Sequence, residues 1–379
     1  MSQIKFMCEK TLLMDALNLV GRAVPSRTTL PILECILLTA EDGVGITLSA
    51  NDMEMSIITT PIEADIDISG SVALNARLFT EIIRKMPGDY IQIEADDKLI
   101  TKCRCGQAKL EIAGLPADEY PTISEDELEA AQTRYNLKSS TLRDMIKQTI
   151  FSVSLDPSKA VLTGELLEIT ENVLRVVSVD MFRISYRSVL LPEDVVNASA
   201  VVPAKALNEL SRAISGDNEE EMSFYFTNKR VMFETGSFTM SARLLEGEFI
   251  RYNQIFNKDF TTAVVIDRAT LLGSLERSIL VAMENRQISI TLDIKDDVLV
   301  ITSQSEKGQT YDEIPCETDG TDIKIYFNPR YLIEALRAID EEKIVLKLNT
   351  PKSPCTIQSL TGESITDYKY LIVPLRGPA

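Results

Sequence analysis

The chain has 379 residues, too many for one ordinary hydrophobic core, so we expect two or three domains. It has no histidine, no phosphate-binding loop, no G-x-S-x-G motif and no dinucleotide-binding glycine fingerprint, which argues against most hydrolases and nucleotide-dependent enzymes. Its 39 basic and 57 acidic residues give a net charge of −18, so nucleic acid would bind only where basic residues gather on one surface. No apolar run is long enough to span a bilayer and the N-terminus is not a signal peptide, so we expect a cytoplasmic protein.

The six cysteines are scattered, and only Cys103 and Cys105 lie close together. A C-x-C pair with no second cysteine pair nearby is a poor zinc site. We therefore expect reduced, mostly buried thiols, and neither a metal nor a cofactor.

The first third of the chain predicts an ordered series of elements. A short β segment (residues 4–8) precedes a helix that starts at Thr11, and two strands separated by a polar turn follow (36–49). A second helix (73–86) and an acidic turn then lead into a β-hairpin (91–103).

The same series recurs twice. The later copies comprise β segments at 134–138 and 263–267, helices from Thr141 and Thr270, strand pairs at 166–178 and 288–303, second helices at 201–214 and 326–339, and hairpins at 222–234 and 344–358. The sequence thus predicts an α+β fold with three repeated domains, each with two helices packed on antiparallel sheets. We place these domains at 1–124, 133–256 and 260–379, joined by an acid- and proline-containing stretch at 121–129 and by a second connection at 253–262.

The second helices of the three units align without a gap. Each carries a basic residue, a glutamate and an arginine at positions i, i+4 and i+7, which lie on one stripe of a helix. The sets are Arg77/Glu81/Arg84, Lys205/Glu209/Arg212 and Arg330/Glu334/Arg337. One interpretation is an intrahelical ladder of ion pairs with little effect on stability. The other, favoured by the recurrence, is a net-positive stripe that attracts a phosphate backbone without reading its sequence.

Acidic pairs such as Asp52/Glu54 and Asp65/Asp67 leave an enzyme that uses carboxylates as an open alternative. Alternating acids on a strand are, however, typical of a solvated face.

Several short motifs follow one another along the whole chain: RTTLPIL (27–33), AGLPADEYP (113–121), LTG (162–164), VPAK (202–205), LEGEF (245–249) and YLIVPLR (370–376). With these motifs the chain resembles the bacterial DNA polymerase III β subunit, or β sliding clamp, family. The resemblance implies a DNA-clamp fold, in which three domains form half of a six-domain ring whose helices line the hole. It also implies a non-enzymatic processivity factor, a homodimer that encircles duplex DNA and tethers the polymerase III catalytic subunit, the clamp loader and other proteins with a clamp-binding motif.

The resemblance implies DNA contacts at Arg27, Arg77 and Lys205, and repeat symmetry extends them to Arg84, Arg212, Arg330 and Arg337. It also implies a hydrophobic pocket for a partner's linear peptide, although the apolar members could be ordinary core. The pocket positions are Leu162, Val179, Asp180, Met181, Phe182, Arg183, Ile184, Ile250, Gln254, Ile255, Pro354, Leu371, Val373, Pro374, Leu375 and Arg376. Ring closure is implied near the four residues Leu110, Ile112, Leu280 and Val281, which could equally be core.

The chain departs from the family pattern at the pocket. Asp180-Met181-Phe182-Arg183 stands where the family usually has Asp-Gly-His-Arg, and Ile250 stands where proline is common. The chain also continues past Arg376 with Gly377-Pro378-Ala379. These departures leave open a second hypothesis, a divergent clamp paralogue with an altered partner-peptide pocket.

Overall fold

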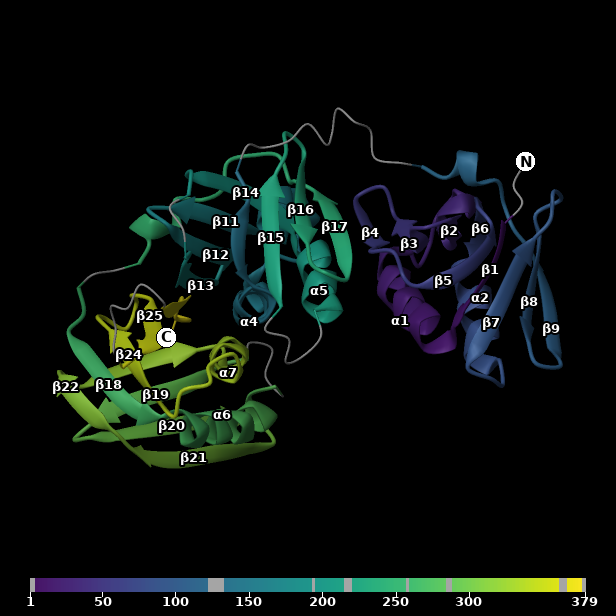
Figure 1. The fold of residues 1–379 in the computed structure, drawn as a ribbon. Helices are drawn as coiled ribbons and strands as arrows, with labels where there is room; N and C mark the ends of the chain where they lie inside the picture. Colours follow the sequence, from purple (N-terminus) through teal and green to yellow (C-terminus); the bar gives the residue numbers. More distant parts are fainter. Residues whose placement is uncertain are drawn as a thin grey trace. The chain divides into compact units, whose positions relative to one another are not determined.

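The computed structural model in Figure 1 describes residues 4–121, 133–192, 195–214, 220–256, 259–283, 288–360 and 367–376. Most of the expected linker at 121–129 and the tail Gly377-Pro378-Ala379 lie outside these residues. Contacts group the chain into two compact units, Met1–Ser140 with Glu209–Leu244 and Thr141–Asn208 with Leu245–Ala379.

The first repeat contains the expected elements in the expected order. Its helices are α1 (Lys10–Val20) and α2 (Ala76–Lys85). Its strands are β1 (Ile4–Glu9), β2 (Cys35–Glu41), β3 (Gly45–Asn51), β4 (Met55–Thr59), β5 (Ala64–Ile68), β6 (Gly70–Asn75), β7 (Tyr90–Ala95), β8 (Ile100–Cys105) and β9 (Ala108–Ala113). Asn75 caps α2, because its side chain accepts a hydrogen bond from the Leu78 backbone N–H (3.1 Å).

The second repeat follows the same plan. Its helices are α4 (Ser139–Thr149) and α5 (Ala204–Ala213), the latter entered directly after Pro203. Its strands are β10 (Tyr135–Lys138), β11 (Gly164–Thr170), β12 (Val173–Val179), β13 (Arg183–Leu190), β14 (Ala198–Pro203), β15 (Glu221–Phe226), β16 (Arg230–Glu234) and β17 (Phe238–Arg243).

The third repeat has the helices α6 (Arg268–Ala282) and α7 (Pro329–Arg337). Its strands are β18 (Thr262–Asp267), β19 (Ile290–Lys295), β20 (Val298–Ser305), β21 (Gly308–Pro315), β22 (Glu317–Gly320), β23 (Ile323–Phe327), β24 (Lys343–Leu348), β25 (Cys355–Ser359) and β26 (Tyr368–Ile372). Pro329 opens α7, and the Asn328 side chain accepts a hydrogen bond from the Arg330 N–H (3.1 Å). Asparagine and proline thus mark the entries of these helices.

Two large antiparallel sheets cross the boundaries between the sequence repeats. One has the order β10-β15-β16-β17-β4-β3-β2-β6 and is joined where Phe238–Ala242 of β17 pairs with Met55–Thr59 of β4. The other has the order β14-β11-β12-β13-β26-β25-β24-β18-β22 and is joined where Arg183–Arg187 of β13 pairs with Tyr368–Ile372 of β26. Pairing of these strands satisfies backbone groups that an open edge would expose. Each compact unit therefore follows a sheet rather than one sequence repeat.

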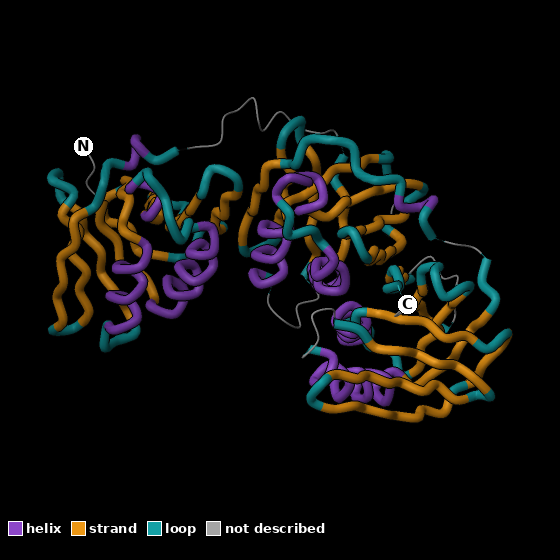
Figure 2. Tube along the Cα trace, turned by 180° about the vertical axis from the view of Figure 1, so that it is seen from behind, coloured by secondary structure: helices purple, strands orange, loops and turns teal. Residues whose placement is uncertain are grey.

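Two smaller sheets, β5-β1-β7-β8-β9 and β21-β20-β19-β23, complete the first and third repeats. In these repeats the two helices lie side by side (Figure 2), α1 with α2 and α6 with α7. Leu13 and Leu17 of α1 and Phe79 and Ile83 of α2 are buried. Because the apolar faces point into the core, the polar faces of the helices remain at the surface.

Candidate functional site

Helix α2 presents its basic stripe to solvent. Arg77, Glu81 and Arg84 are exposed, while the apolar residues of the helix are buried. Arg84 forms an ion pair with Glu81, and Arg77 has no ion-pair partner among the described residues. The Arg84–Glu81 pair is half-exposed and so contributes little to stability, but it neutralises one of the two arginines. One uncompensated positive charge remains on this stripe.

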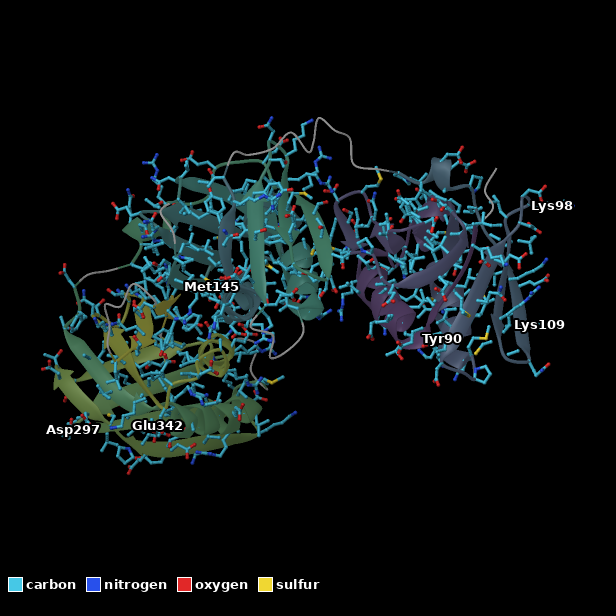
Figure 3. All side chains as sticks on the ribbon, in the orientation of Figure 1. Tyr90, Lys98, Lys109, Met145, Asp297 and Glu342 are labelled. Atoms are coloured by element: carbon cyan, nitrogen blue, oxygen red, sulfur yellow. The ribbon has the colours of Figure 1, made fainter. Side chains whose placement is uncertain are left out.

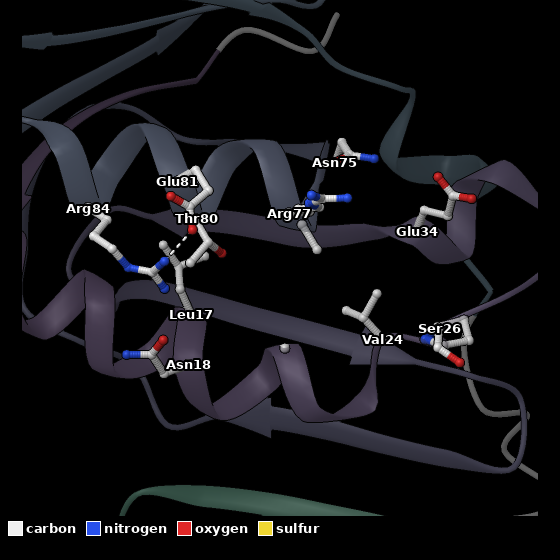
Figure 4. Close-up of a pocket in the computed structure, with 13 residues that line it drawn as sticks. Leu17, Asn18, Val24, Ser26, Glu34, Asn75, Arg77, Thr80, Glu81 and Arg84 are labelled. Atoms are coloured by element: carbon white, nitrogen blue, oxygen red, sulfur yellow. Dashed lines mark hydrogen bonds and ion pairs between the residues drawn. The ribbon is translucent and has the colours of Figure 1, made fainter.

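A groove of about 700 Å³ runs between α1 and α2 and is lined by Arg77 and Arg84. Figure 4 shows Arg84 extending from α2 toward Asn18 of α1. Ser26 also lines the groove, and the exposed Arg27 follows it in the chain. The structure thus brings the three basic residues expected in the first repeat to the surroundings of one groove.

Helix α5 exposes Lys205 and Arg212, the two basic residues expected in the second repeat. Arg212 lies 3.1 Å from Glu209, and the same glutamate lies 3.5 Å from Arg22, which follows α1. Arg22 was not foreseen from the sequence, because its contact joins two repeats and leaves no trace in the repeat pattern.

Helix α7 also exposes its two arginines, Arg330 and Arg337, beside a groove of about 570 Å³ between α6 and α7. Its ion pairs differ from those of α2. Arg337 donates to Glu276 of α6 (2.7 Å), and Glu334 pairs with Arg183 of β13. An intrahelical ladder is therefore the wrong description of this helix, because both of these side chains have partners on other elements.

Five of the apolar positions expected to form the peptide pocket lie in one hydrophobic cluster. Val179, Ile184 and Leu371 are buried there, whereas Leu162 and Ile250 are only half-buried at its margin. The first three therefore belong to the core, and the last two are available at the surface.

Other pocket positions lie between β17 and β18, just before β25 and just after β26. Gln254, Ile255, Val373 and Arg376 are exposed, while Pro354, Pro374 and Leu375 are half-buried. The Val373 N–H donates to the Phe182 carbonyl (2.8 Å), which fixes the C-terminal segment beside the β12–β13 turn.

Arg183 anchors the β12–β13 turn to the third repeat. Its guanidinium lies 3.0 Å from the Asp180 carboxylate, pairs with Glu334 and donates to the Phe151 carbonyl. The same guanidinium lies 4.6 Å from the centroid of the Tyr331 ring. Glu334 and Tyr331 were not assigned to this neighbourhood from the sequence, because they lie about 150 residues away along the chain.

The residues expected at a subunit boundary differ in exposure. Leu110, on the edge strand β9, is 43% exposed, whereas Ile112 on the same strand is only 7% exposed and belongs to the core. Leu280 on α6 is 70% exposed and Val281 is half-buried. Lys109, next to Leu110 on β9, is exposed (Figure 3).

The acidic pairs considered for an enzyme have ordinary local roles. The Asp52 side chain accepts hydrogen bonds from the N–H groups of Glu54 (3.1 Å) and Met55 (2.7 Å), and Asp67 pairs with Lys5 (2.7 Å). In the part of the chain that the structure describes, no group of histidine, cysteine and acidic residues has a metal-binding arrangement.

The cysteines are free, and all but Cys316 are buried. Burial raises the pKa of the Cys103 thiol to about 12, so the thiol stays protonated and a poor metal ligand at neutral pH. No helix among the described residues is long and apolar enough to cross a membrane.

Comparison with known proteins covers the whole chain. Residues 4–124, 136–250 and 253–376 match the N-terminal, central and C-terminal domains of the DNA polymerase III beta subunit family. The beta sliding clamp of Staphylococcus aureus is 31% identical over 382 aligned positions, which cover 98% of this chain and 99% of the relative. Among solved structures, the DNA polymerase sliding clamp of Bacillus subtilis is 28% identical, with a TM-score of 0.94 and full coverage of both chains.

The beta subunit of Streptococcus pyogenes DNA polymerase gives a TM-score of 0.93 at 27% identity, over 99% of this chain and 100% of the relative. These matches agree with the three repeats and the mixed helix and sheet content of the structure. The chain therefore belongs to the DNA polymerase III beta subunit family, the beta sliding clamps.

Proposed function

We propose that two copies of the chain form a closed ring that encircles duplex DNA and holds the replicative polymerase there. The observation that carries the proposal is the exposed basic stripe that recurs on α2, α5 and α7 in a chain of net charge −18. Acidic surface repels DNA, so attraction is confined to the surfaces that carry these stripes.

The ring would hold DNA by topology rather than by tight binding. Arginine and lysine side chains that contact phosphates provide loose, salt-sensitive attraction without sequence preference. Arg27, Arg77 and Lys205 make the principal contacts in this proposal, and Arg84, Arg212, Arg330 and Arg337 support them. A closed ring can then slide along the duplex without leaving it sideways.

Each copy would contribute three domains, at 1–124, 133–256 and 260–379. The edge strand β9, with the exposed Leu110, would meet the third domain of the other copy near Leu280 and Val281. An unpaired edge strand is suited to this role because it carries free backbone hydrogen-bonding groups.

Partner proteins would dock a short linear peptide on the cluster that includes Leu162 and Ile250. This surface suits apolar anchor residues on a largely preformed site. The partners in this proposal are the polymerase III catalytic subunit, the clamp loader and other proteins with a clamp-binding motif, in the cytoplasm and without a cofactor.

Membership in the sliding clamp family makes the chain a processivity subunit and not an enzyme. The full-length matches to sliding clamps do not favour the divergent paralogue as an alternative.

Retention on DNA of different topology tests the proposal. The protein is loaded onto a nicked circular plasmid by its clamp loader, and half of the sample is then linearised with a restriction enzyme. We expect the protein to elute with the circular plasmid on gel filtration and to be lost from the linear one. Equal retention on both forms would contradict the ring, because binding by contact alone does not depend on free ends.

A further inference from the structure

The first helix of each repeat begins at an equivalent residue: Lys10 in α1, Ser139 in α4 and Arg268 in α6. The backbone N–H of each donates to the carbonyl just before β7, β15 or β24. The acceptors are Asp89, Glu220 and Glu342, at 2.7, 2.9 and 2.8 Å. Because the backbone is alike at the three places, the roles of the three side chains can be compared directly.

Lys10 and Arg268 each bring a positive charge to the end of the second helix of their repeat. The Lys10 Nζ donates to the carbonyl of Met86, the residue that ends α2 (2.6 Å). The Arg268 guanidinium donates to the carbonyls of Leu336 in the last turn of α7 (3.2 Å) and of Glu341 (2.9 Å). The end of a helix has unsatisfied carbonyls and a partial negative charge, so a cation there is favourable.

The second repeat has a cavity where the other two have this cation. The Ser139 side chain is too short to reach the end of α5. It is 1% exposed, and its hydroxyl has no hydrogen-bond partner among the described residues, which is unusual for a buried polar group. Ser139 lines a cavity of about 440 Å³ together with Ile214, the residue aligned with Met86. This volume is in the range of sites for small ligands.

The wall of the cavity is acidic in one part and apolar in another. Asp15 of α1 and Glu220 both line it, and neither has an ion-pair partner in the part of the chain that the structure describes. Glu220 is oriented by a hydrogen bond that its carboxylate accepts from the Gly236 N–H (2.7 Å). Leu19 and Phe238 supply apolar surface. The described residues that line the cavity include no lysine or arginine, so its negative charge is not compensated from within.

We propose that this cavity binds a primary alkylammonium ligand. The nitrogen takes the place that Lys10 Nζ has in the first repeat. An ammonium group has three hydrogen-bond donors and no acceptor, which matches the Ile214 carbonyl, the Ser139 hydroxyl and the Glu220 carboxylate. The alkyl chain packs on the apolar part of the wall. A hard metal ion is a poorer match, because it requires about six oxygen ligands and gains nothing from apolar surface.

All the residues that line the cavity belong to one compact unit, Met1–Ser140 with Glu209–Leu244. Within this unit the ligand would join α1 of the first repeat to the end of α5 in the second, since Asp15 and Ile214 line the same cavity. We therefore expect occupancy to stabilise this unit.

NMR titration of the full-length protein tests the site. The isoleucine methyl groups are isotope-labelled, the Ile214 signal is identified by its absence in Ile214→Val, and n-pentylamine is added at neutral pH, where it is protonated. We expect the Ile214 signal to shift saturably with a Kd on the order of 1 mM. Pentyltrimethylammonium has the same charge but no N–H donor and should bind at least about 10-fold more weakly. No saturable shift, or equal binding of the two compounds, would overturn the proposal.

Variants at Ser139 test whether the cavity lacks a cation. Ser139→Lys supplies the ammonium from the chain itself. It should abolish binding of n-pentylamine and raise the melting temperature by about 1–2 °C. Ser139→Met fills the space without a charge and should not raise the melting temperature. An equal rise in both variants would contradict a cation site, because filling the space alone would then account for it.

A second pair of variants keeps the test independent of folding at Ser139. Glu220→Gln retains an oxygen for the Gly236 N–H but removes the charge, and should weaken binding of n-pentylamine about 5-fold. Glu63→Gln removes an exposed acid elsewhere and should leave the affinity unchanged. Equal affinities of these two variants would contradict the role of Glu220 and the proposal with it.

The source of the ammonium is distinguished with two further probes in the same titration, cadaverine and Nα-acetyl-lysine methylamide. Tighter binding of cadaverine would support a free diamine as the ligand. Tighter binding of the lysine derivative would support a lysine side chain of another protein. Binding of neither probe at Ile214 would overturn the proposal.

Discussion

The grooves beside α2 and α7 carry the same sequence motif but differ in how its charges are used. In the first repeat Arg84 pairs with Glu81 of its own helix, and Arg77 has no ion-pair partner among the described residues. In the third repeat Arg337 pairs with Glu276 of α6, and Glu334 pairs with Arg183 of β13 instead of an arginine of its own helix. The spacing shared by the repeated helices therefore determines where the charges lie. Ion pairs with neighbouring elements determine which of these charges remain available to a ligand.

The largest effect is expected from charge reversal of the proposed principal contacts. Arg77→Glu with Lys205→Glu should weaken binding to a short duplex by at least about 10-fold at ~0.1 M salt, because each reversal replaces attraction to phosphate with repulsion. Fluorescence anisotropy measures the affinity, and light scattering should show an unchanged dimer mass. The control, Lys229→Glu with Lys352→Glu, makes the same charge change at exposed turns elsewhere and should have little effect. Equal loss of affinity in both double variants would contradict the assignment of Arg77 and Lys205 as DNA contacts.

Glu81 of α2 and Glu334 of α7 occupy the same position in the repeated helix but should differ in their contribution to stability. Glu334→Gln should lower the free energy of unfolding by about 1 kcal/mol, because the mostly buried Arg183 loses one of its two carboxylate partners. Glu81→Gln should change it by no more than about 0.5 kcal/mol, because its pair with Arg84 is half-exposed. Urea denaturation of the two variants gives the comparison directly. Equal values would show that the two glutamates are equivalent after all.

Single arginines should differ in their contribution to salt dependence. Arg77→Ala should reduce the slope of log affinity against log salt by about 0.9, the value for one lost phosphate contact. Arg337→Ala should reduce it by less than half as much, because Glu276 already neutralises this side chain. Both slopes are obtained from duplex binding measured between about 50 and about 300 mM salt, where the dependence on salt reports phosphate contacts. A larger change in slope for Arg337→Ala than for Arg77→Ala would show that Arg337, and not Arg77, contributes more to phosphate contact.

The smallest effect is expected from releasing Arg337. Glu276→Gln removes the ion-pair partner of Arg337 and should raise affinity for duplex DNA about 2-fold. The groove between α6 and α7 would then resemble the groove between α1 and α2 in having an arginine without an ion-pair partner. Glu63→Gln removes an exposed acid from another surface and serves as the matched control. No difference between the two variants would mean that the Arg337–Glu276 pair does not limit contact with DNA.

The elements of the fold were predictable because their signals are local. Asn75 and Asn328 mark helix entries, and alternating apolar residues mark the hairpins that follow them. The pairings of β17 with β4 and of β13 with β26 were not predictable, because they join segments from different repeats and depend on the packing of whole domains.

The candidate site was predictable to a similar extent. Helical periodicity places Arg77, Arg212 and Arg330 on exposed stripes, and the structure agrees. The partners of Glu334 and Arg337 were not foreseen, because they lie on β13 and α6. The stacking of Phe182 on Tyr331 has the same character, since it joins a turn of the second repeat to a helix of the third.

Photocrosslinking from defined positions tests most directly whether the three basic stripes face DNA. A photoreactive amino acid is placed at residue 77, 205 or 330, or at exposed Tyr90 or Glu63 as controls, and each protein is loaded onto a nicked circular plasmid. We predict crosslinks to DNA from residues 77, 205 and 330 and none above background from the two controls. Crosslinks of equal yield from the controls, or none from residues 77 and 205, would contradict the account.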